Sequence, residues 1–211
     1  MQTYYLDEVG STQTYLKELI LEKDVEFPCA VVAKIQTNGI GSRGNSWTGM
    51  EGNLFLSFGI PLAQLPKDLK IESASIYYAY LLKETLCELN SKVWLKWPND
   101  FYVDNKKIGG MITNISKGTL ICGVGINLVQ APEGFATLDL QITQETILKR
   151  YFLKLQKNVS WKQVFSKYKL EFDKSKEFYT HNKNIKISLE GAILESDGSV
   201  TSNGERIFSL R

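Results

Sequence analysis

Residues 93 to 126 constrain the fold more than any other part of the chain. They contain four strand-like segments in immediate succession: Val93 to Trp97, Phe101 to Val103, Lys107 to Ile115 and Thr119 to Ile126. The short polar segments Asp104 to Lys106 and Ser116 to Gly118 are typical of tight turns, and strands joined so closely pair antiparallel. The sequence therefore predicts an antiparallel meander over this region.

Helices and further strands surround the meander, so the predicted class is α+β. Ser11 and Thr12 favour a helix N-terminus and are followed by apolar residues at helical spacing. Between Ile71 and Leu89, apolar residues recur at three- and four-residue steps, which predicts an amphipathic helix over about residues 70 to 90. The other expected elements are strands near Thr3 to Leu6, over Cys29 to Ile35 and over Leu54 to Ile60, and helices around Gln144 to Gln156 and Trp161 to Phe172.

The C-terminal end differs from the rest of the chain in its pattern of predicted secondary structure. After the polar stretch Thr180 to Asn184, short β segments alternate with turn sequences such as Asp197-Gly198 and Asn203-Gly204. We therefore expect two parts, a main domain over residues 1–181 and a small β domain over residues 182–211. A β unit this short is not stable alone and should dock on the main domain.

Composition and charge exclude several classes of protein. A formal net charge of +2 over 211 residues is no electrostatic footprint for general nucleic-acid binding. No segment approaches the roughly 18 apolar residues of a membrane span, and the N-terminus lacks the pattern of a signal peptide. We therefore expect a cytoplasmic protein with neither nucleic acid nor membrane as partner. The 3 cysteines are widely spaced, which argues against a disulfide framework or a structural zinc site.

The single histidine limits the chemistry further. His181 lies in a polar stretch, and one histidine argues against both a catalytic triad and a multi-histidine metal site. We interpret it as a solvated linker residue.

The block from Lys96 to Asp100 places a cation at the end of an apolar strand and then stops the strand. Pro98 cannot donate to a β ladder, and Asn99 and Asp100 form a natural turn pair. This arrangement suits an anionic ligand. The alternative is a lysine whose stem packs on tryptophan while its ammonium reaches water.

Residues 39 to 44 match the pattern G-x-G-x-x-G and follow a strand. A dinucleotide-binding loop would open a helix, but residues 45 to 49 are poor helix formers and the next element reads as a strand. We therefore set aside a nucleotide-cofactor oxidoreductase. The glycines still allow close approach to a ligand, Arg43 offers a guanidinium for an anion, and Trp47 offers a flat apolar face. The alternative is a surface loop in which glycine only permits turns.

A second set of glycines lies on a predicted strand. Gly123, Gly125 and Asn127 alternate along it and share one face, so a bare surface ending in an amide would form a slot for a flat group. Gly109 and Gly110 could act similarly on the neighbouring strand. Close packing against a helix, or a barrel-like bend, is the alternative.

Taken together, these residues resemble the biotin protein ligases, which activate biotin with ATP and transfer it to a lysine of a carrier domain. The block from Lys96 to Asp100 is highly specific to that family, whereas the glycine loop alone is not. The resemblance spans nearly the whole chain and rests on six motifs in order: Ser11 to Gln13, Gln36 with the loop Gly39-x-Gly41-x-x-Gly44-x-x-Trp47, Lys96 to Asp100, Lys107 to Gly110, Gly123-x-Gly125-Ile126-Asn127, and Ser209 to Arg211. It implies a class II aminoacyl-tRNA-synthetase/biotin-ligase-like catalytic domain followed by a small SH3-like β-barrel.

The resemblance also implies the site residues. Lys96, where the biotin carboxylate meets the α-phosphate, and Arg43 would be catalytic. Biotin would contact Ser11, Thr12, Gln13, Gln36, Gly39, Ile40, Gly41, Ser42, Trp47, Lys96, Gly123 and Gly125. ATP or the adenylate would contact Arg43, Trp47, Lys96, Asn99, Lys107, Asn127 and Arg211. Metal ligands cannot be assigned from the sequence.

The implied reagents are biotin as substrate, ATP as co-substrate and Mg²⁺ as activating ion, with no bound prosthetic group. The implied partner is the biotin carboxyl carrier domain of a biotin-dependent carboxylase. Bifunctional members of the family begin with a DNA-binding domain, and here the ligase pattern begins almost at Met1. We therefore expect a ligase only, as a monomer or a homodimer.

The glycine loop departs from the family pattern, which has arginines at the positions of Ile40, Ser42 and Asn45. Only Arg43 remains, at a normally variable position. A weaker clamp on the adenylate is the resulting hypothesis, with labelling of bystander lysines as its consequence.

Two alternative functions stay open at this point. A lipoate-protein ligase shares the chemistry, but its pocket takes an apolar dithiolane, whereas Ser11 to Gln13 and Gln36 suit a ring that donates and accepts hydrogen bonds. The second alternative is a non-catalytic biotin-binding relative.

Overall fold

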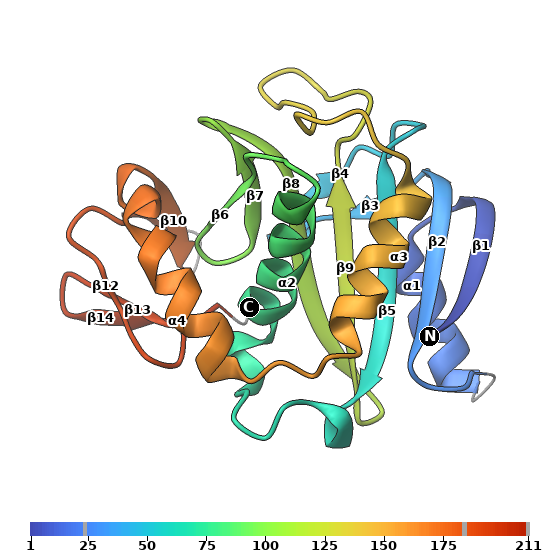
Figure 1. The fold of residues 1–211 in the computed structure, drawn as a ribbon, viewed down its shortest axis with the longest axis horizontal. Coiled ribbons are helices and arrows are strands. Elements are labelled where there is room, and N and C mark those ends of the chain that lie inside the picture. The colour runs from blue at the N-terminus through green and yellow to red at the C-terminus, as the bar shows by residue number, and fades with distance from the viewer. Residues whose placement is uncertain (23–24, 183–184, 210–211) are drawn as a thin grey trace.

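A seven-stranded mixed sheet forms the centre of the computed structural model, which describes residues 1–22, 25–182 and 185–209 (Figure 1). The strand order is β1-β2-β5-β9-β8-β7-β6, and β1 runs parallel to β2 while every other neighbouring pair is antiparallel. The strands are β1 (Gln2–Val9), β2 (Cys29–Gln36), β5 (Leu54–Pro61), β6 (Trp94–Lys96), β7 (Asp100–Val103), β8 (Lys106–Ser116) and β9 (Thr119–Ile126).

The predicted meander is confirmed, because β6 to β9 are neighbours in chain order. Its two tight turns contain Asp104 (φ 48°) and Lys117 (φ 44°), both in the left-handed region. Asp tolerates that region better than most residues, and Gly118 follows Lys117 with φ 73°. These turns set the register that brings the start of β7 opposite the middle of β8.

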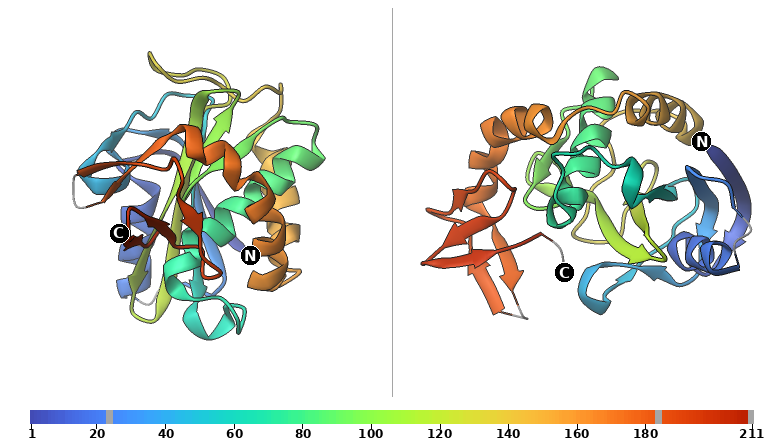
Figure 2. Two further views of the ribbon diagram at one scale, coloured as in Figure 1. Left: turned by 90° about the vertical axis from the view of Figure 1, so that its left-hand side faces the viewer. Right: turned by 90° about the horizontal axis from the view of Figure 1, so that it is seen from below.

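Helices cover both faces of the sheet (Figures 1 and 2). The helix α1 (Thr12–Glu22) connects β1 to β2 and packs Leu16 and Ile20 against Cys29, Val31 and Ile121. The opposite face carries the larger core under α2 (Ala74–Glu88), α3 (Gln144–Leu155) and α4 (Trp161–Glu171). Since β2 is buried on both faces, it reads in sequence as a continuous apolar run rather than an alternating one.

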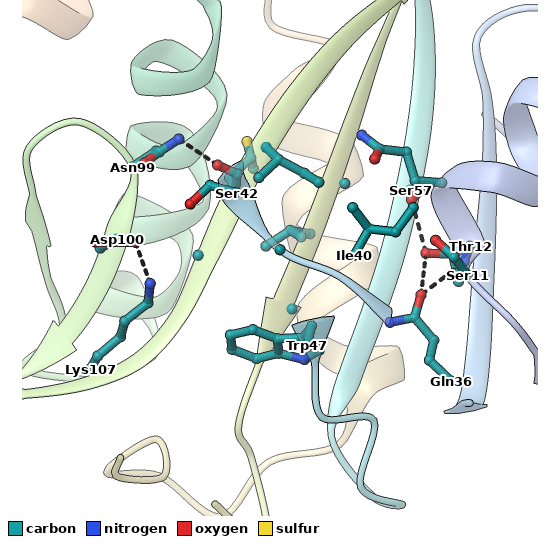
Figure 3. Close-up of a pocket in the computed structure, with 18 residues that line it drawn as sticks. Ser11, Thr12, Gln36, Ile40, Ser42, Trp47, Ser57, Asn99, Asp100 and Lys107 are labelled. Carbon is teal, nitrogen blue, oxygen red and sulfur yellow. Dashed lines mark hydrogen bonds and ion pairs between the residues drawn. The ribbon is translucent and has the colours of Figure 1, made fainter. Parts of the chain in front are cut away.

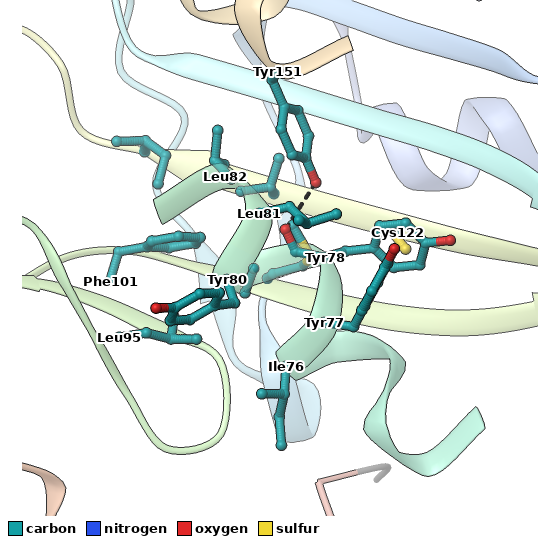
Figure 4. Close-up of a cluster of buried hydrophobic side chains, with 14 of the residues drawn as sticks. Ile76, Tyr77, Tyr78, Tyr80, Leu81, Leu82, Leu95, Phe101, Cys122 and Tyr151 are labelled. Carbon is teal, nitrogen blue, oxygen red and sulfur yellow. Dashed lines mark hydrogen bonds between the residues drawn. The ribbon is translucent and has the colours of Figure 1, made fainter. Parts of the chain in front are cut away.

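Tyrosines fill much of the core beneath α2 (Figure 4). Tyr78 packs edge-on to Phe58 and to Tyr77, and Tyr151 of α3 donates a hydrogen bond to the carbonyl of Tyr78 at 2.9 Å. Burial raises the pKa of Tyr151 well above its usual value, so this phenol stays neutral. Tyr77 and Tyr151 therefore act as apolar bodies whose hydroxyls donate to backbone carbonyls.

Two small sheets form a C-terminal β region over residues 179–209. Its strands are β10 (Tyr179–Asn182), β11 (Ile185–Ser188), β12 (Ile193–Leu194), β13 (Val200–Ser202) and β14 (Glu205–Ile207). The expected division between residues 181 and 182 falls inside β10, which pairs with β11.

The C-terminal β region docks on the main sheet as expected for so short a unit. Leu189, Ala192, Val200 and Ile207 belong to the large core. The Trp97 indole N–H donates to the Gly198 carbonyl at 2.8 Å, in a fully buried contact. Burial of these four residues and this bond supply the stabilisation that an isolated β unit lacks.

Several elements differ from expectation in extent. The helix predicted over residues 70 to 90 begins as a 3₁₀ turn at Ile71–Ser73 and continues as α2, and β6 begins at Trp94. The glycine loop contains an unpredicted small hairpin of β3 (Gly39–Ile40) and β4 (Ser46–Trp47) around the 3₁₀ turn Ser42–Gly44. The remaining 3₁₀ segments are Leu62–Gln64 and Phe172–Glu177. Among the described residues, no helix combines the length and apolarity needed to cross a membrane.

Candidate functional site

The glycine loop, the N-terminus of α1 and the middle of the sheet enclose a cavity of about 550 Å³, including its open mouth (Figure 3). We call it the first cavity. Its walls are Ser11, Thr12, Gln13, Gln36, Ile40, Gly41, Ser42, Trp47, Ser57, Asn99, Asp100, Lys107, Gly110, Met111, Ile112, Gly123, Val124 and Gly125. A loop folded as a hairpin instead of a helix start confirms that the G-x-G-x-x-G pattern here is not a dinucleotide-binding turn.

One end of the first cavity is a hydrogen-bonded polar cluster of Thr12, Gln36 and Ser57. The side-chain amide oxygen of Gln36 (Oε1) accepts hydrogen bonds from the backbone N–H of Thr12 at 2.8 Å and from the Thr12 hydroxyl at 3.0 Å. The Ser57 hydroxyl lies 2.9 Å from that of Thr12. Because the Thr12 proton points to Gln36, Ser57 donates to Thr12, and each polar group is held in one orientation.

Two buried donors at the first cavity have no hydrogen-bond partner. In the part of the chain that the structure describes, the side-chain N–H groups of Gln13 (Nε2) and Trp47 (Nε1) are fully buried and unpaired. Both residues line the first cavity. An unpaired buried donor costs about 1–3 kcal/mol, so these two groups are suited to a ligand that accepts hydrogen bonds.

Trp47 lies on the glycine face of β9. A Cβ atom on Gly125 would come within 2.7 Å of the Trp47 indole ring, which the close-up shows between the two ends of the cavity (Figure 3). The ring also makes an edge contact with Phe135, at 6.5 Å between ring centroids. Gly125 therefore lacks a side chain so that an aromatic ring can approach closely. The ring that lies there is the indole of Trp47, where a flat group of the ligand was expected from the sequence.

The glycines of β8 have a different role from those of β9. A Cβ atom on Gly109 would come within 2.4 Å of the Gly125 carbonyl oxygen. Close packing of β8 on β9 therefore accounts for Gly109, whereas Gly110 lines the first cavity.

The other end of the first cavity carries a cluster of two lysines and one aspartate. Asp100 contacts the ammonium of Lys107 at 2.6 Å and that of Lys96 at 3.4 Å. Burial alone would raise the pKa of Asp100, but the charges and hydrogen bonds of Lys107 and Lys96 outweigh it and hold that pKa below its usual value. The cluster keeps one net positive charge, which suits an anion.

Lys96 is buried, with 7% of its surface exposed. Its ammonium also lies 5.9 Å from the centre of the Tyr102 ring. The alternative of a lysine whose head extends into bulk water is therefore wrong for this residue.

Lys96 lines a second, larger cavity of about 950 Å³, which lies between the main sheet and the C-terminal β region. It shares Gln13, Ile40, Gly41, Ser42, Asn99, Asp100 and Ile112 with the first cavity, so the two adjoin. From β10 it is lined by Tyr179, Thr180 and His181. The interpretation of His181 as a solvated linker residue is wrong, because the residue is half-buried in a strand that forms part of a cavity wall.

Most of the residues expected at the site come together. Those that line the first cavity are Ser11, Thr12, Gln13, Gln36, Ile40, Gly41, Ser42, Trp47, Asn99, Lys107, Gly123 and Gly125. Gly39 lies behind Trp47, where a Cβ atom would come within 2.5 Å of the Trp47 carbonyl oxygen. Arg43 lies in the 3₁₀ turn of the loop, and Arg211 lies outside the described residues.

Asn127 is placed differently from the other predicted ligand contacts. It follows the last residue of β9 and is 1% exposed. Its amide donates to the Ala136 carbonyl at 3.2 Å and lies 3.5 Å from the amide nitrogen of Asn53. These contacts hold the segment that follows β9, and Asn127 is not part of the wall of either cavity.

Sequence reasoning did not assign Ser57, Asp100, Met111, Ile112 or Val124 to the site, whereas it had proposed Gly110 as part of a slot. For Ser57 a signal was present, because it is the single hydroxyl in the apolar strand Leu54–Pro61 and is fully buried. A lone buried hydroxyl in such a strand requires a hydrogen-bond partner.

A protein-held metal ion does not fit the site. Within the described ranges, no three His, Cys, Asp or Glu side chains come together in a way that could hold one. Asp100 is the carboxylate nearest to the cavities, and it is already paired with two lysines.

Three known proteins illustrate what the chain is similar to. The biotin acetyl coenzyme A carboxylase synthetase of Helicobacter pylori, solved with bound biotinylated ATP, superimposes with a TM-score of 0.93 and 39% identity over 98% of this chain and 99% of that one. The biotin protein ligase of Aquifex aeolicus, in complex with biotin and ATP, gives 0.78 and 25% identity over 100% and 96%. The bifunctional ligase/repressor BirA of Escherichia coli (strain K12) is 32% identical over 130 residues, which are 58% of this chain and 39% of BirA.

The family model described as Biotin/lipoate A/B protein ligase family matches residues 5–129. These residues contain α1, the glycine loop, the meander and the Lys96 to Asp100 block. The α+β architecture matches the solved ligases over nearly its whole length, which confirms the expected fold. Because the matched segment is more than half of the chain and holds both ends of the first cavity, the chain belongs to the biotin/lipoate A/B protein ligase family.

Proposed function

We propose that the chain is an ATP-dependent biotin–protein ligase that forms biotinyl-5′-AMP and transfers biotin to a lysine of a biotin carboxyl carrier domain. The observation that carries this proposal is one cavity with a neutral, hydrogen-bonding end and a cationic end. Biotin joins a polar ring to a carboxylate, and its adenylate adds a phosphate, so the ligand has the same order of groups.

The neutral end favours biotin over lipoate. The ureido ring of biotin donates two N–H bonds and accepts through its carbonyl, whereas a dithiolane does neither. Thr12, Gln36 and Ser57 supply fixed oxygens, and Gln13 supplies an unpaired donor. Binding a dithiolane would leave the Gln13 donor buried without a partner, which is the basis of discrimination against it.

The cationic end supports the first step, in which the biotin carboxylate attacks the α-phosphate of ATP. Both reactants are anions, so their repulsion has to be offset. A unit charge 4 Å away contributes about 4 kcal/mol at an effective dielectric of 20. Lys96 and Lys107, held by Asp100 at the junction of the two cavities, supply such charges.

The remaining assignments are part of the same proposal. Arg43, Trp47, Asn99 and Arg211 would act on the nucleotide side, with Mg²⁺ entering as the ion bound to ATP. Asn127 would act there only indirectly, through the segment after β9 that its amide holds.

Transfer then needs an acceptor lysine close to the mixed anhydride. The second cavity adjoins Lys96 and supplies a route for that lysine, so that proximity and orientation drive the reaction. The acceptor in this proposal is the carrier domain of an acetyl-CoA carboxylase.

The test combines the purified protein with ATP, Mg²⁺ and either biotin or lipoate, with and without a carrier domain. We expect pyrophosphate release with biotin alone and a carrier mass increased by one biotinyl group in the full mixture. Lipoylation of the carrier would instead identify a lipoate ligase. Biotin binding without pyrophosphate release would identify a non-catalytic relative.

The variant Thr12→Val tests the assignment of the neutral end of the first cavity to biotin. It keeps the shape of the side chain but removes the hydroxyl that bonds Gln36 and Ser57. We expect its KM for biotin to rise, with the KM for ATP unchanged. An equal loss for both substrates would contradict the assignment of this end of the cavity to biotin.

A further inference from the structure

The second cavity is lined both by the single histidine of the chain and by Lys96, the cation at the reacting end of the site. His181 lines this cavity together with Lys96, Asn99 and Asp100, although 81 or more positions separate them in the sequence. Charged groups among the described residues that share its cavity or its sheet are Lys96 and Asp100, Lys186 opposite it on β11, and Glu205, which accepts a hydrogen bond from the neighbouring Asn182.

The transfer step requires a proton acceptor. A lysine in water is an ammonium ion with a pKa of about 10.4 and cannot attack until it loses a proton. Among the described residues that line the two cavities, Lys96 and Lys107 are cations, and Asp100 is a weak base because both lysines hold its pKa low. The other lining side chains, His181 apart, are amides, hydroxyls, a phenol or apolar groups. An imidazole, with an ordinary pKa of about 6.5, is suited to accept a proton near neutrality.

We propose that His181 is the general base of the transfer step. Its neutral imidazole takes one proton from the incoming lysine ammonium. The freed nitrogen attacks the acyl carbon of the adenylate, the C–N bond forms, and the bond from that carbon to the phosphate oxygen breaks. AMP leaves with the electron pair, the new amide loses its second proton to water, and His181 returns its proton to solvent. This inference rests on the proposed ligase function.

The test separates proton removal from the other steps. The adenylate is formed on the enzyme first, and single-turnover transfer is then measured to the carrier domain of an acetyl-CoA carboxylase and to hydroxylamine, which is already unprotonated at neutral pH. We expect His181→Gln to slow transfer to the carrier about 100-fold at pH 7, with hydroxylamine transfer and pyrophosphate release unchanged. Asn182→Ala, the adjacent residue on β10 outside the cavity wall, should change none of the three.

The pH dependence gives an independent measurement on the unmodified protein. Transfer to the carrier by the wild type should fall in acid as the imidazole becomes protonated, whereas in His181→Gln it should keep rising toward the lysine pKa of about 10.4. A wild-type transfer rate with no titration below the lysine pKa would overturn the proposal, even if the variant failed to fold.

Two further results would overturn it. Equal slowing with hydroxylamine, or slower pyrophosphate release, would show that His181 acts on adenylate binding or on the first step. Absence of any adenylate in the wild type would reject the ligase function itself, and is distinguishable because it appears before an acceptor is added.

Discussion

Asp100 sets the charge of the site, because it holds two lysine ammonium groups together. Asp100→Asn leaves two cations facing each other and should lower the free energy of unfolding by about 1–3 kcal/mol at pH 7. The pKa of Asp100 is depressed in the folded state. Its contribution is therefore present above the unfolded pKa of about 3.9 and is lost as the pH falls through the lower folded pKa.

Urea unfolding of both proteins at pH 7 and at several acidic pH values measures this effect. The difference between wild type and Asp100→Asn should shrink in acid. Asp104→Asn is the matched control, because Asp104 is exposed and its left-handed turn position suits asparagine equally well. A difference that stayed constant down to pH 2 would contradict the proposed charge coupling.

Lys96 is the cation that the proposed first step depends on. Lys96→Ala should lower biotin-dependent pyrophosphate release about 100- to 1,000-fold with the fold intact by circular dichroism, since one electrostatic contact to the developing charge is worth that much. Lys92→Ala, an exposed lysine on the same approach to β6, should leave the rate unchanged. Normal pyrophosphate release by Lys96→Ala would remove the residue from the mechanism.

The absence of a side chain at Gly125 leaves room for the Trp47 ring. The added methyl of Gly125→Ala would lie 2.7 Å from the indole, so Trp47 has to move away from β9. We expect a loss of about 1–3 kcal/mol in unfolding free energy, together with a change in the intrinsic tryptophan fluorescence. Trp47→Ala in the same chain should restore most of the stability lost, and no recovery would show that the strain lies elsewhere.

At the scale of elements, one turn of the C-terminal β region attaches it to the main sheet. Gly198 has φ 80°, and a Cβ atom there would come within 2.9 Å of Ile76 and 3.1 Å of Trp161. Its carbonyl accepts the indole N–H of Trp97, the neighbour of Lys96. Nearby bonds join the Ser73 hydroxyl to the Asp197 carbonyl and the Ser209 hydroxyl to the Glu72 carbonyl. The position of Lys96 is therefore coupled to the docking of this region.

Comparison of two glycines tests this coupling. Gly191→Ala changes a residue with φ 68° and no neighbour within 4 Å, so it should lose only the about 1–2 kcal/mol expected of a left-handed backbone. Gly198→Ala should lose about 1–3 kcal/mol more from overpacking, and pyrophosphate release should fall with it. Equal losses of stability, or full activity in Gly198→Ala, would show that the turn does not position Lys96.

For the molecule as a whole, the prediction concerns ligand-dependent stability. A ligand that binds only the folded protein adds about 2.7 kcal/mol at 100 times its Kd. Biotin should therefore raise the thermal midpoint, and lipoate at the same concentration should not, because biotin can accept a hydrogen bond from the unpaired Gln13 donor and a dithiolane cannot. A larger shift with lipoate would contradict the proposed substrate.

The order of elements could largely be predicted from sequence because it depends on local chemistry. The meander follows from turn residues at Asp104 and Gly118, and α1 begins at Thr12, beside the Ser11 expected at its start. The small hairpin of the glycine loop was missed because its two-residue strands have no periodicity of their own and depend on pairing Gly39 with Trp47.

The residues of the candidate site could likewise be identified only in part from the sequence. Residue types and spacing within one segment identified Lys96 as a cation for an anion, and the family motifs identified the residues around the first cavity. Only the tertiary structure decided that Trp47 covers Gly125, that Ser57 completes the Thr12 cluster, and that His181 belongs to a cavity wall instead of a linker.

The sequence by itself therefore determined the class of fold and the chemical character of each segment, because hydrophobic period, turn residues and side-chain type are local properties. The tertiary structure alone decided which distant side chains meet. Close packing and docking of the C-terminal β region place His181 and Lys96 on one cavity, and such contacts depend on the sum of many weak interactions over the whole chain.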